Sequence, residues 1–320
     1  MCQAVVIGGD LNALGVVRSL AAGKVPMLVL GDDAAGPAMH SRHGHKLLVA
    51  ATSGEPLLRE LERIGSAAPQ PPVLFLTEEK SVRTVSEHRD SILPLFRIRL
   101  PDHERLMDLM DKSSFQALAL QHGCLIPAAV SLKSETDLDR VERLRFPCVL
   151  KPAQKDYEYG ARFQKAYIVR DIDEVSGLFR RIAPILPNLI VQEWIDGGDS
   201  DIYFCLVYLG SSRRSVMSFS GRKLRSWPPR IGGTASCLGT TEHADTLLRL
   251  TEDFFGAVQF TGMGSMEYKL DRRDGRFYMI EPTVARTDFQ EEVATVNGVN
   301  IPLASYLHET GGEPYRAAPE

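Results

Sequence analysis

The sequence has few cysteines, no long hydrophobic run and no net positive charge. Its five cysteines are odd in number and widely separated, with no Cys-x-x-Cys pair, which suits a protein of the reduced cytoplasm. The apolar run in "MCQAVVIGGD" lacks a basic region before it and is far too short for a signal peptide or a membrane span, so it predicts a first strand. A cytoplasmic protein without a membrane partner is therefore expected.

The charge balance bears on the class of partner. A net charge of -4 and a pI near 6.1 supply no overall positive field for a phosphate backbone, so nucleic acid is not an expected partner. The 44% hydrophobic and 24% charged residues are close to the averages of soluble globular proteins, which argues against a disordered chain or a membrane protein. At 320 residues the chain is long enough for two or three lobes, each with its own core.

The first part of the chain, residues 1–97, reads as an α/β lobe. Four short β-rich runs ("AVVIGG", "PMLVLG", "HKLLVA" and "PVLFLT") and a helix-compatible "LNALGVVRSLAA" predict a parallel sheet covered on both faces. Gly8, Gly9 and Gly15 do not have the G-x-G-x-x-G spacing, so a tight strand-to-helix turn is preferred over a dinucleotide site. The histidines of "MHSRHGHK" are interpreted as a polar loop, not as a metal site.

Lys151 is a candidate phosphate ligand. "FPCVLKPA" predicts an apolar strand from Phe146 to Leu150 that delivers Lys151 at its end, where Pro152 is expected to halt regular pairing. A cation at the mouth of a buried strand is costly unless an anion meets it, and a phosphate would serve. Lys112 lies in a segment of predicted amphipathic helices, where a lysine by itself is usually just solvated.

The stretch "IVQEWIDGGDSD" is a candidate purine slot. A strand leads into Gln192, Glu193, Trp194 and Ile195, and the chain then loosens at a Gly-Gly pair. Exposed backbone beside an aromatic and an aliphatic side chain suits a flat purine, and a carboxylate just beyond, of Asp199 or Asp201, could hold the ribose hydroxyls. The alternative is a simple Gly-Gly turn whose acids face water.

Two glutamates stand among the apolar residues of a predicted hairpin. If Asp274-Gly275 forms its turn, Glu267 comes to within about one position of facing Glu281, which places the two roughly 5 Å apart. Like charges at that separation repel unless one is protonated or a divalent cation sits between them, and magnesium prefers such hard oxygen ligands. Salt bridges with neighbouring lysine or arginine residues are the alternative.

A basic run, "SGRKLRSWPPRIGG", contains Arg222, Lys223, Arg225 and Arg230. It can be a solvated loop or a nucleic-acid patch, and the overall charge argues against the second. A third interpretation follows from its place between the purine slot and the glutamate hairpin. Its cationic groups could receive an anionic substrate or the acyl-phosphate formed from it.

In order, Lys112, "FPCVLKP", "IVQEWIDGGD", "GSMEYKL" and "YMIEPTVAR" resemble the ATP-grasp superfamily, in particular the carboxylate–amine ligases related to carbamoyl phosphate synthase and D-Ala-D-Ala ligase. The resemblance covers about residues 100–305 and implies an α+β ATP-grasp fold with subdomains 98–185 and 186–320, preceded by a Rossmann-like domain. It assigns Lys112 and Lys151 to the phosphates of ATP, Gln192 to Ile195 to adenine, Asp199 to ribose, and Glu267 and Glu281 to magnesium, or to manganese in its place.

The chain departs from this pattern at two places. The final strand of the family reads Glu-x-Asn with an arginine soon after, whereas this chain has Glu281-Pro282-Thr283 and then Arg286. Threonine offers a metal only one oxygen, so the number of metal ions is left open. The phosphate loop, "AQKDYEYGARFQKAYIV", has the single glycine Gly160, with Lys155 and Lys165 nearby.

The resemblance implies a ligase that joins a small-molecule carboxylate to an amine through an acyl-phosphate and releases ADP and phosphate. Lys151, Arg225 and Arg286 are its expected catalytic residues, and Arg222, Lys223, Arg225 and Arg286 its expected substrate-binding residues. The alternatives are an ATP-grasp kinase that phosphorylates a small molecule and a non-catalytic nucleotide-binding protein. A homodimer is an ordinary expectation for this class.

Overall fold

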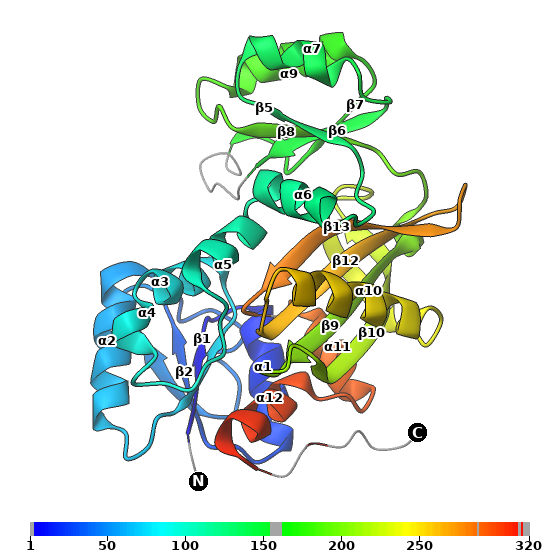
Figure 1. The fold of residues 1–320 in the computed structure, drawn as a ribbon. Coiled ribbons are helices and arrows are strands. Elements are labelled where there is room, and N and C mark those ends of the chain that lie inside the picture. The colour runs from blue at the N-terminus through cyan, green and yellow to red at the C-terminus, as the bar shows by residue number, and fades with distance from the viewer. Residues whose placement is uncertain (1–2, 154–161, 287, 313–314, 316–320) are drawn as a thin grey trace.

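A parallel sheet forms the first part of the computed structural model, which describes residues 3–153, 162–286, 288–312 and 315 (Figure 1). Its strands are β1 (Ala4–Ile7), β2 (Met27–Gly31), β3 (His45–Leu48) and β4 (Val73–Leu76), in the order β3-β2-β1-β4. The helices of this part are α1 (Leu11–Ala22), α2 (Gly54–Ala67), α3 (Glu79–Glu87) and α4 (Arg89–Ile92). All neighbouring strands run parallel, so the four strands and the first helix predicted from the sequence are confirmed.

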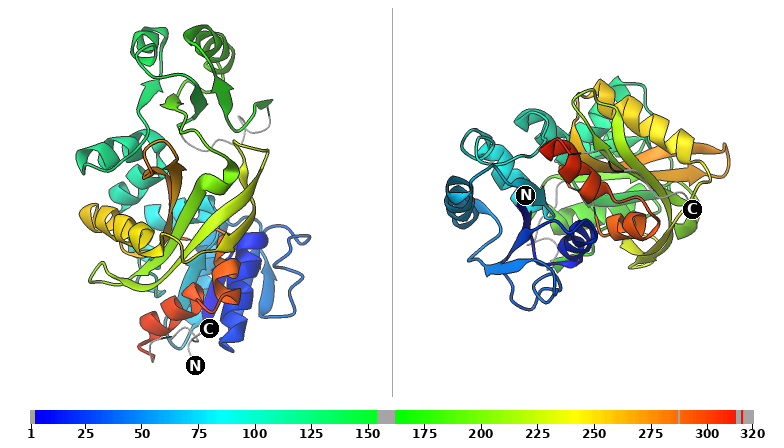
Figure 2. Two further views of the ribbon diagram at one scale, coloured as in Figure 1. Left: turned by 90° about the vertical axis from the view of Figure 1, so that its right-hand side faces the viewer. Right: turned by 90° about the horizontal axis from the view of Figure 1, so that it is seen from below.

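Helices cover both faces of this sheet. Successive strand residues point to opposite faces, and accordingly Val5 belongs to the same core as Leu57 and Leu61 of α2, whereas Val6 belongs to the core of Val17 in α1. The late helices α11 (Gln290–Val296) and α12 (Ile301–Thr310) pack against α1. The two ends of the described chain therefore lie at the same end of the molecule (Figure 2).

An antiparallel sheet forms a second layer, reached through α5 (His103–Met110) and α6 (Lys112–Gln121). Its strands are β5 (Ala129–Leu132), β6 (Cys148–Pro152), β7 (Tyr167–Val169) and β8 (Leu189–Glu193), in the order β5-β8-β6-β7. The short helix α7 (Leu138–Val141) and α9 (Ile172–Ile182) cover one face (Figure 1). Their side chains bury Val130, Leu150 and Val191 of the sheet against Val175 and Phe179 of α9.

The expectation that Pro152 halts strand pairing is wrong. Pro152 pairs with Leu189 of β8, although the pairing of β6 with β7 ends at Leu150. The next residue, Ala153, donates its N–H to the carbonyl of Asn188 at 3.1 Å. The ladder on the β8 side therefore has no need of the N–H that proline lacks.

A five-stranded antiparallel sheet forms the third part. Its strands are β9 (Ile202–Leu209), β10 (Ser215–Trp227), β11 (Gly233–Gly239), β12 (Gly262–Asp271) and β13 (Arg276–Val284), in the order β11-β10-β9-β12-β13. Helix α10 (Ala244–Ala257) covers the face that carries Tyr203, Cys205 and Val207. Residues 222–227 of the basic run belong to β10, so a solvated loop is the wrong description of that segment.

The three sheets occupy separate parts of the molecule. The sheet of β5 to β8 stands apart from the other two, joined to them by the segment that contains α5 and α6 (Figures 1 and 2). The expected domain boundaries near residues 97 and 185 stay predictions; both positions lie between regular elements, after α4 and after α9 respectively. No helix among the described residues is both long enough and apolar enough to cross a lipid bilayer.

Candidate active site

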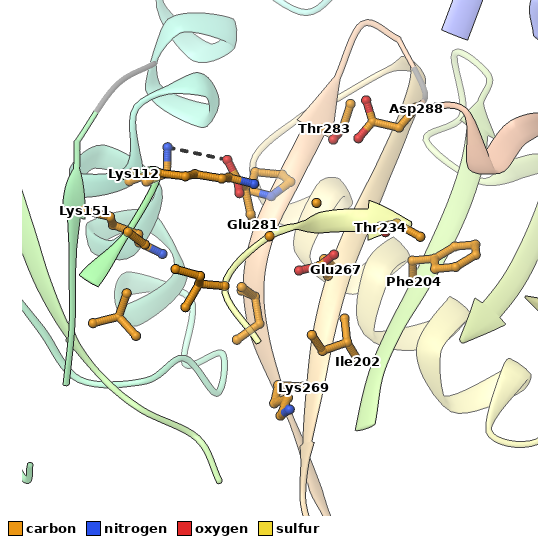
Figure 3. Close-up of a pocket in the computed structure, with 18 of the residues that line it drawn as sticks. Lys112, Lys151, Ile202, Phe204, Thr234, Glu267, Lys269, Glu281, Thr283 and Asp288 are labelled. Carbon is orange, nitrogen blue, oxygen red and sulfur yellow. Dashed lines mark ion pairs between the residues drawn. The ribbon is translucent and has the colours of Figure 1, made fainter. Parts of the chain in front are cut away.

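A cavity of about 730 Å³ lies where the second and third sheets face each other (Figure 3). Its lining comes from α5 and α6, from β6 and β8 on one side, and from β9, β10, β12 and β13 on the other. Glu79, the first residue of α3, extends the lining to the first part of the chain. Most of the residues expected to bind ATP, metal and substrate line this cavity: Lys112, Lys151, Gln192, Glu193, Trp194, Ile195, Lys223, Glu267, Glu281, Thr283 and Arg286.

The two predicted phosphate lysines reach the cavity from different elements. Lys151 lies near the end of β6, and its Nζ donates to Oε1 of Gln192 on the neighbouring strand at 2.9 Å. Lys112 is the first residue of α6, and its backbone N–H donates to the carbonyl of Ala153 at 3.0 Å, which ties the helix to the end of β6. In the sequence the rest of α6, β5 and α7 lie between the two lysines, and the fold brings both into one cavity.

Burial lowers the pKa of Lys151 to about 8. The loss of hydration is the main cause, because it disfavours the charged form, and Glu281 opposes it by stabilising the ammonium. The cations of Lys112 and Lys165 act in the same direction as burial. A phosphate bound beside Lys151 would raise this pKa again, since an anion favours the charged form.

The hairpin of β12 and β13 places two glutamates opposite each other. Its register pairs Glu267 with Glu281 directly, so the sequence-based prediction that the two residues face each other is confirmed. Oε2 of Glu267 is 3.0 Å from Nζ of Lys223, and Oε1 of Glu281 is 3.5 Å from Nζ of Lys112 (Figure 3). Each carboxylate thus has a lysine from a neighbouring element as its ion partner.

The neighbouring cations on the same hairpin are directed elsewhere. Lys269 donates to the carbonyl of Gly198 at 2.5 Å, and Arg272 pairs with Asp201 at 2.7 Å. Burial lowers the pKa of Lys269. The alternative weighed from the sequence was salt bridges of the glutamates with Lys269, Arg272 or Arg276. The first two are directed elsewhere, and the lysines that do pair with the glutamates come from other elements.

The donor set of the hairpin fits a hard cation. Glu267 and Glu281 offer carboxylate oxygens on facing positions of adjacent strands, and Thr283 lines the same cavity two residues after Glu281. Among the described residues no cluster of three or more His, Cys, Asp or Glu side chains could hold a metal. An ion at the two glutamates would therefore need oxygens from a ligand, as magnesium commonly takes from phosphates.

The predicted purine segment follows β8 along the cavity wall. Gln192 accepts from Lys151, while Glu193 is directed toward Arg145, whose backbone N–H donates to Oε1 of Glu193 at 2.8 Å. The backbone N–H of Trp194 donates to the carbonyl of Pro147 at 3.0 Å. The indole ring lies 5.4 Å from the guanidinium carbon of Arg230. This end of the cavity thus has an aromatic face and a fixed backbone.

Three residues with expected roles lie outside the cavity lining: Asp199, Arg222 and Arg225. The carboxylate of Asp199 accepts from the backbone N–H of Ser226 at 2.7 Å and so fixes the end of β10. Register shifts on either side of Arg225 turn this exposed residue away, and its neighbour Lys223 points inward, 2% exposed. The geometry therefore gives no support to a ribose role for Asp199 or to a substrate role for either arginine.

The last strand ends in a buried arginine. Arg286 is 8% exposed, lines the cavity and forms an ion pair with Asp288. The preceding residue, Ala285, has a φ of 60°, a left-handed conformation that costs a non-glycine residue about 1–2 kcal/mol. This turn brings Arg286 into the cavity. Figure 3 shows Thr283 and Asp288 on the other side of Glu281 from Lys151.

Sequence reasoning missed several cavity residues. They include Glu79, Thr234, Lys269, Asp288 and Gln290. Lys269 follows Glu267 at a spacing of two along β12, and this alternation was a usable signal. Gln290 reaches the cavity only through the packing of distant segments, for which the sequence has no signal. Arg230, which the sequence had singled out within the basic run, also lines the cavity. Lys165 of the phosphate loop lines the cavity, whereas Lys155 and Gly160 lie outside the described residues.

Comparisons with known proteins were made by sequence and by structure. Over 317 residues the chain is 23% identical to a D-aspartate ligase of Enterococcus faecium. The alignment covers 93% of this chain and 74% of that protein. No protein-family model matches the chain. The N5-carboxyaminoimidazole synthetase of Staphylococcus aureus, complexed with ADP, matches with a TM-score of 0.73 at 13% identity, over 98% of this chain and 79% of that one.

A second solved structure gives the same result. The biotin carboxylase domain of the 2-oxoglutarate carboxylase from Hydrogenobacter thermophilus, in complex with MgADP, ADP and bicarbonate, matches with a TM-score of 0.71 at 14% identity, over 98% of this chain and 70% of that one. These structural neighbours are ATP-grasp enzymes. The chain has the ATP-grasp fold, and the fold expected from the order of its motifs is confirmed.

Proposed function

We propose that this ATP-grasp chain is an ATP-dependent ligase that joins a carboxylate to an amine through an acyl-phosphate. One observation carries the proposal: a single cavity holds Lys112 and Lys151 together with the facing carboxylates of Glu267 and Glu281. Cations for the phosphates and oxygens for a divalent ion are what phosphoryl transfer from ATP requires of a protein, because catalysis depends mainly on positioning and charge stabilisation.

The reaction begins with attack of the substrate carboxylate on the γ-phosphate of ATP. Lys151 and Lys112 offset the negative charge that spreads over the transferred phosphoryl oxygens. The carboxylate oxygen becomes bonded to phosphorus as the bond to the β-phosphate oxygen breaks, which leaves ADP and an acyl-phosphate. The amine then attacks the acyl carbon, loses a proton, and displaces inorganic phosphate to form the amide. No covalent intermediate with the enzyme is needed.

A divalent ion has a defined place in this proposal. Glu267 and Glu281 would hold Mg²⁺, with the hydroxyl of Thr283 as a further oxygen, and the ion would neutralise charge on the phosphates. One structural neighbour carries MgADP and another carries ADP, which supports ATP and Mg²⁺ as ligands of this chain; Mn²⁺ stays an expectation. The lysines now paired with the two glutamates, Lys223 and Lys112, would then be available to anionic oxygens.

Arg286 and Lys223 are the proposed carboxylate ligands. Both are buried at the cavity wall, with exposures of 8% and 2%, so a substrate anion would meet them in a region of weak solvent screening. The relative from Enterococcus faecium is a D-aspartate ligase, which makes aspartate, of D or L configuration, the first carboxylate to test. The small-molecule amine and a homodimer stay predictions.

The test is an ATP-turnover assay of the full chain with Mg²⁺, candidate carboxylates and candidate amines. A ligase forms ADP and phosphate only when both substrates are present, and it yields an amide detectable by mass spectrometry. Formation of ADP and a phosphorylated product without an amine would identify a kinase, and nucleotide binding without turnover would identify a non-catalytic binding protein. Either result would contradict the ligase proposal.

Two variants locate the chemistry in the cavity. Lys151→Ala and Glu267→Gln should each reduce ATP turnover by about 100-fold or more, because the first removes a cation at the transferred phosphate and the second removes a carboxylate that would hold the divalent ion there. The matched controls are Lys133→Ala and Glu62→Gln, at exposed positions outside the cavity, which should retain wild-type turnover. Circular dichroism of all four variants checks that the fold persists. Unimpaired turnover in Lys151→Ala would reject the assigned site.

A further inference from the structure

The turn between β10 and β11 crosses to the purine end of the cavity. Arg230, near the middle of this turn, has its guanidinium carbon 5.4 Å from the ring centroid of Trp194. Nζ of Lys269 lies 6.0 Å from the same ring. All three residues line the cavity. The contact of Arg230 with Trp194 therefore joins the third sheet to the segment that follows β8 in the second sheet.

The conformation of the turn holds Arg230 in this position. The N–H of Gly232 donates to the carbonyl of Pro228 at 2.8 Å, and a Cβ at Gly232 would lie 2.0 Å from the carbonyl carbon of Trp227, so only glycine fits. Arg230 itself has a φ of 71°, which is unfavourable for a side-chain-bearing residue. Such a conformation persists only where the surrounding structure determines it.

The indole of Trp194 has an unmet requirement at the same place. Its Nε1 is covered, and within the described parts of the chain it has no hydrogen-bond partner. A buried donor without an acceptor costs free energy that a suitable ligand atom recovers. Purine rings carry nitrogen acceptors. Trp194 thus combines an aromatic face near a cation with an unpaired donor on the ring edge, and it lines a cavity of nucleotide size.

We propose that Arg230 is a nucleotide-retention residue: by contacting Trp194 across the cavity, it closes the purine end over the bound nucleotide and slows nucleotide release. This inference rests on the proposed function, because it takes the cavity to be the nucleotide site. A guanidinium over an indole is stabilising, more so where water is excluded. Loss of this contact should therefore act mainly on dissociation, since association depends on the open cavity and its charges.

The experiment uses the intrinsic fluorescence of Trp194. The chain has only two tryptophans, and the other, Trp227, is 76% exposed, so Trp227→Phe leaves Trp194 as the sole reporter without disturbing a core. Stopped-flow fluorescence with Mg-ATP alone, in the absence of carboxylate and amine, gives the association and dissociation rates. In this background we compare Arg230→Ala and Arg230→Lys with the unchanged residue.

A matched control is present in the chain. Arg213 is also an exposed arginine with a left-handed backbone, at a φ of 59°, in the turn between β9 and β10, and it does not line the cavity. Arg230→Ala should raise the dissociation rate about 2- to 30-fold, the range expected for loss of one cation–π contact between the exposed and the desolvated limits. The dissociation rate of Arg230→Lys should lie between those of the parent and of Arg230→Ala, and Arg213→Ala should leave the rate unchanged.

Two results would overturn the inference. A dissociation rate in Arg230→Ala within twofold of the parent would mean that the contact does not retain nucleotide. Tighter binding in Arg230→Ala would mean that Arg230 obstructs the site. Calorimetry of the parent protein tests separately whether the cavity is a nucleotide site. If the parent protein binds no nucleotide, the proposed function is rejected, and the retention role of Arg230 is rejected with it. Acrylamide quenching of Trp194 without nucleotide, which should increase in Arg230→Ala, tests the contact itself.

Discussion

Glu291 is a fully buried carboxyl group without a cation as partner among its described contacts, and its ionisation should make the protein less stable as the pH rises. It lies in α11 and packs against α1. Its Oε1 accepts from the hydroxyl of Ser19 at 2.5 Å and from Thr295 at 3.1 Å, whereas Oε2 has no hydrogen-bond partner. Burial raises the pKa of Glu291 from 4.5 to about 7, and the hydroxyl hydrogen bonds only partly offset this effect.

The magnitude follows from the shift. Each pKa unit corresponds to about 1.4 kcal/mol, so a rise from 4.5 to about 7 implies a loss of about 3 kcal/mol once the pH exceeds the folded pKa. The pKa of this acid is higher in the folded than in the unfolded protein, so between the two pKa values the native state binds more protons. The free energy of unfolding therefore falls as the pH rises through this window. Most of the change should occur between about pH 5 and pH 8.

The substitution Glu291→Gln removes the titrating group and keeps an acceptor for Ser19. The difference in unfolding free energy between this variant and the wild type should move by about 2 kcal/mol in favour of the variant from pH 5 to pH 8. Urea denaturation followed by far-UV circular dichroism measures it, and a ¹³C titration of the Glu291 carboxyl measures the pKa directly. Glu62→Gln, at an exposed position, is the matched control. A pH-independent difference between Glu291→Gln and the wild type would refute the reasoning.

Two further predictions concern the cavity. The ammonium of Lys151 should titrate near pH 8 in the nucleotide-free protein and at a higher pH with ATP bound, because an anion favours the charged form. NMR of ¹³C-methylated lysines measures both pKa values, and Lys151→Arg identifies the signal. A titration near pH 10.5 without nucleotide would contradict the effect of burial. The substitution Gly232→Ala should distort the turn between β10 and β11, because the new Cβ would lie 2.0 Å from the Trp227 carbonyl carbon. In the Trp227→Phe background it should therefore increase acrylamide quenching of Trp194. The control Gly233→Ala, whose Cβ would have no atom within 4 Å, should leave the quenching unchanged.

The hairpin glutamates could be predicted because the information is local. A short turn fixes the register of the two strands that it joins, so the spacing of Glu267 and Glu281 around Asp274-Gly275 was enough to place them opposite each other. The same applies to the first sheet, whose apolar runs and connecting helix lie close together in sequence. The position of Lys151 at the end of an apolar strand was also a local signal.

The assignments that the geometry does not support depended on information that is not local. The carboxylate of Asp199 fixes the backbone of Ser226, a residue on another strand, and nothing near Asp199 in the sequence indicates this. A register shift between Lys223 and Arg225 breaks the alternation that would otherwise place both side chains on one face. A one-residue change of register sends a side chain to the opposite face of the sheet. The composition of the basic run therefore could not show which of its residues face the cavity and which face away from it.

The sequence by itself determined the elements, the pairing within the hairpin and the chemical types available to the site, because propensity, periodicity and turn geometry act over a few residues. Only the tertiary structure decided which groups meet. Lys112 reaches Glu281 at 3.5 Å, Lys223 reaches Glu267 at 3.0 Å, and Arg230 lies 5.4 Å from the ring of Trp194. These contacts join residues that lie far apart in the sequence, on different helices, strands and turns, and their geometry is set by how the elements pack against one another, to which every part of the chain contributes.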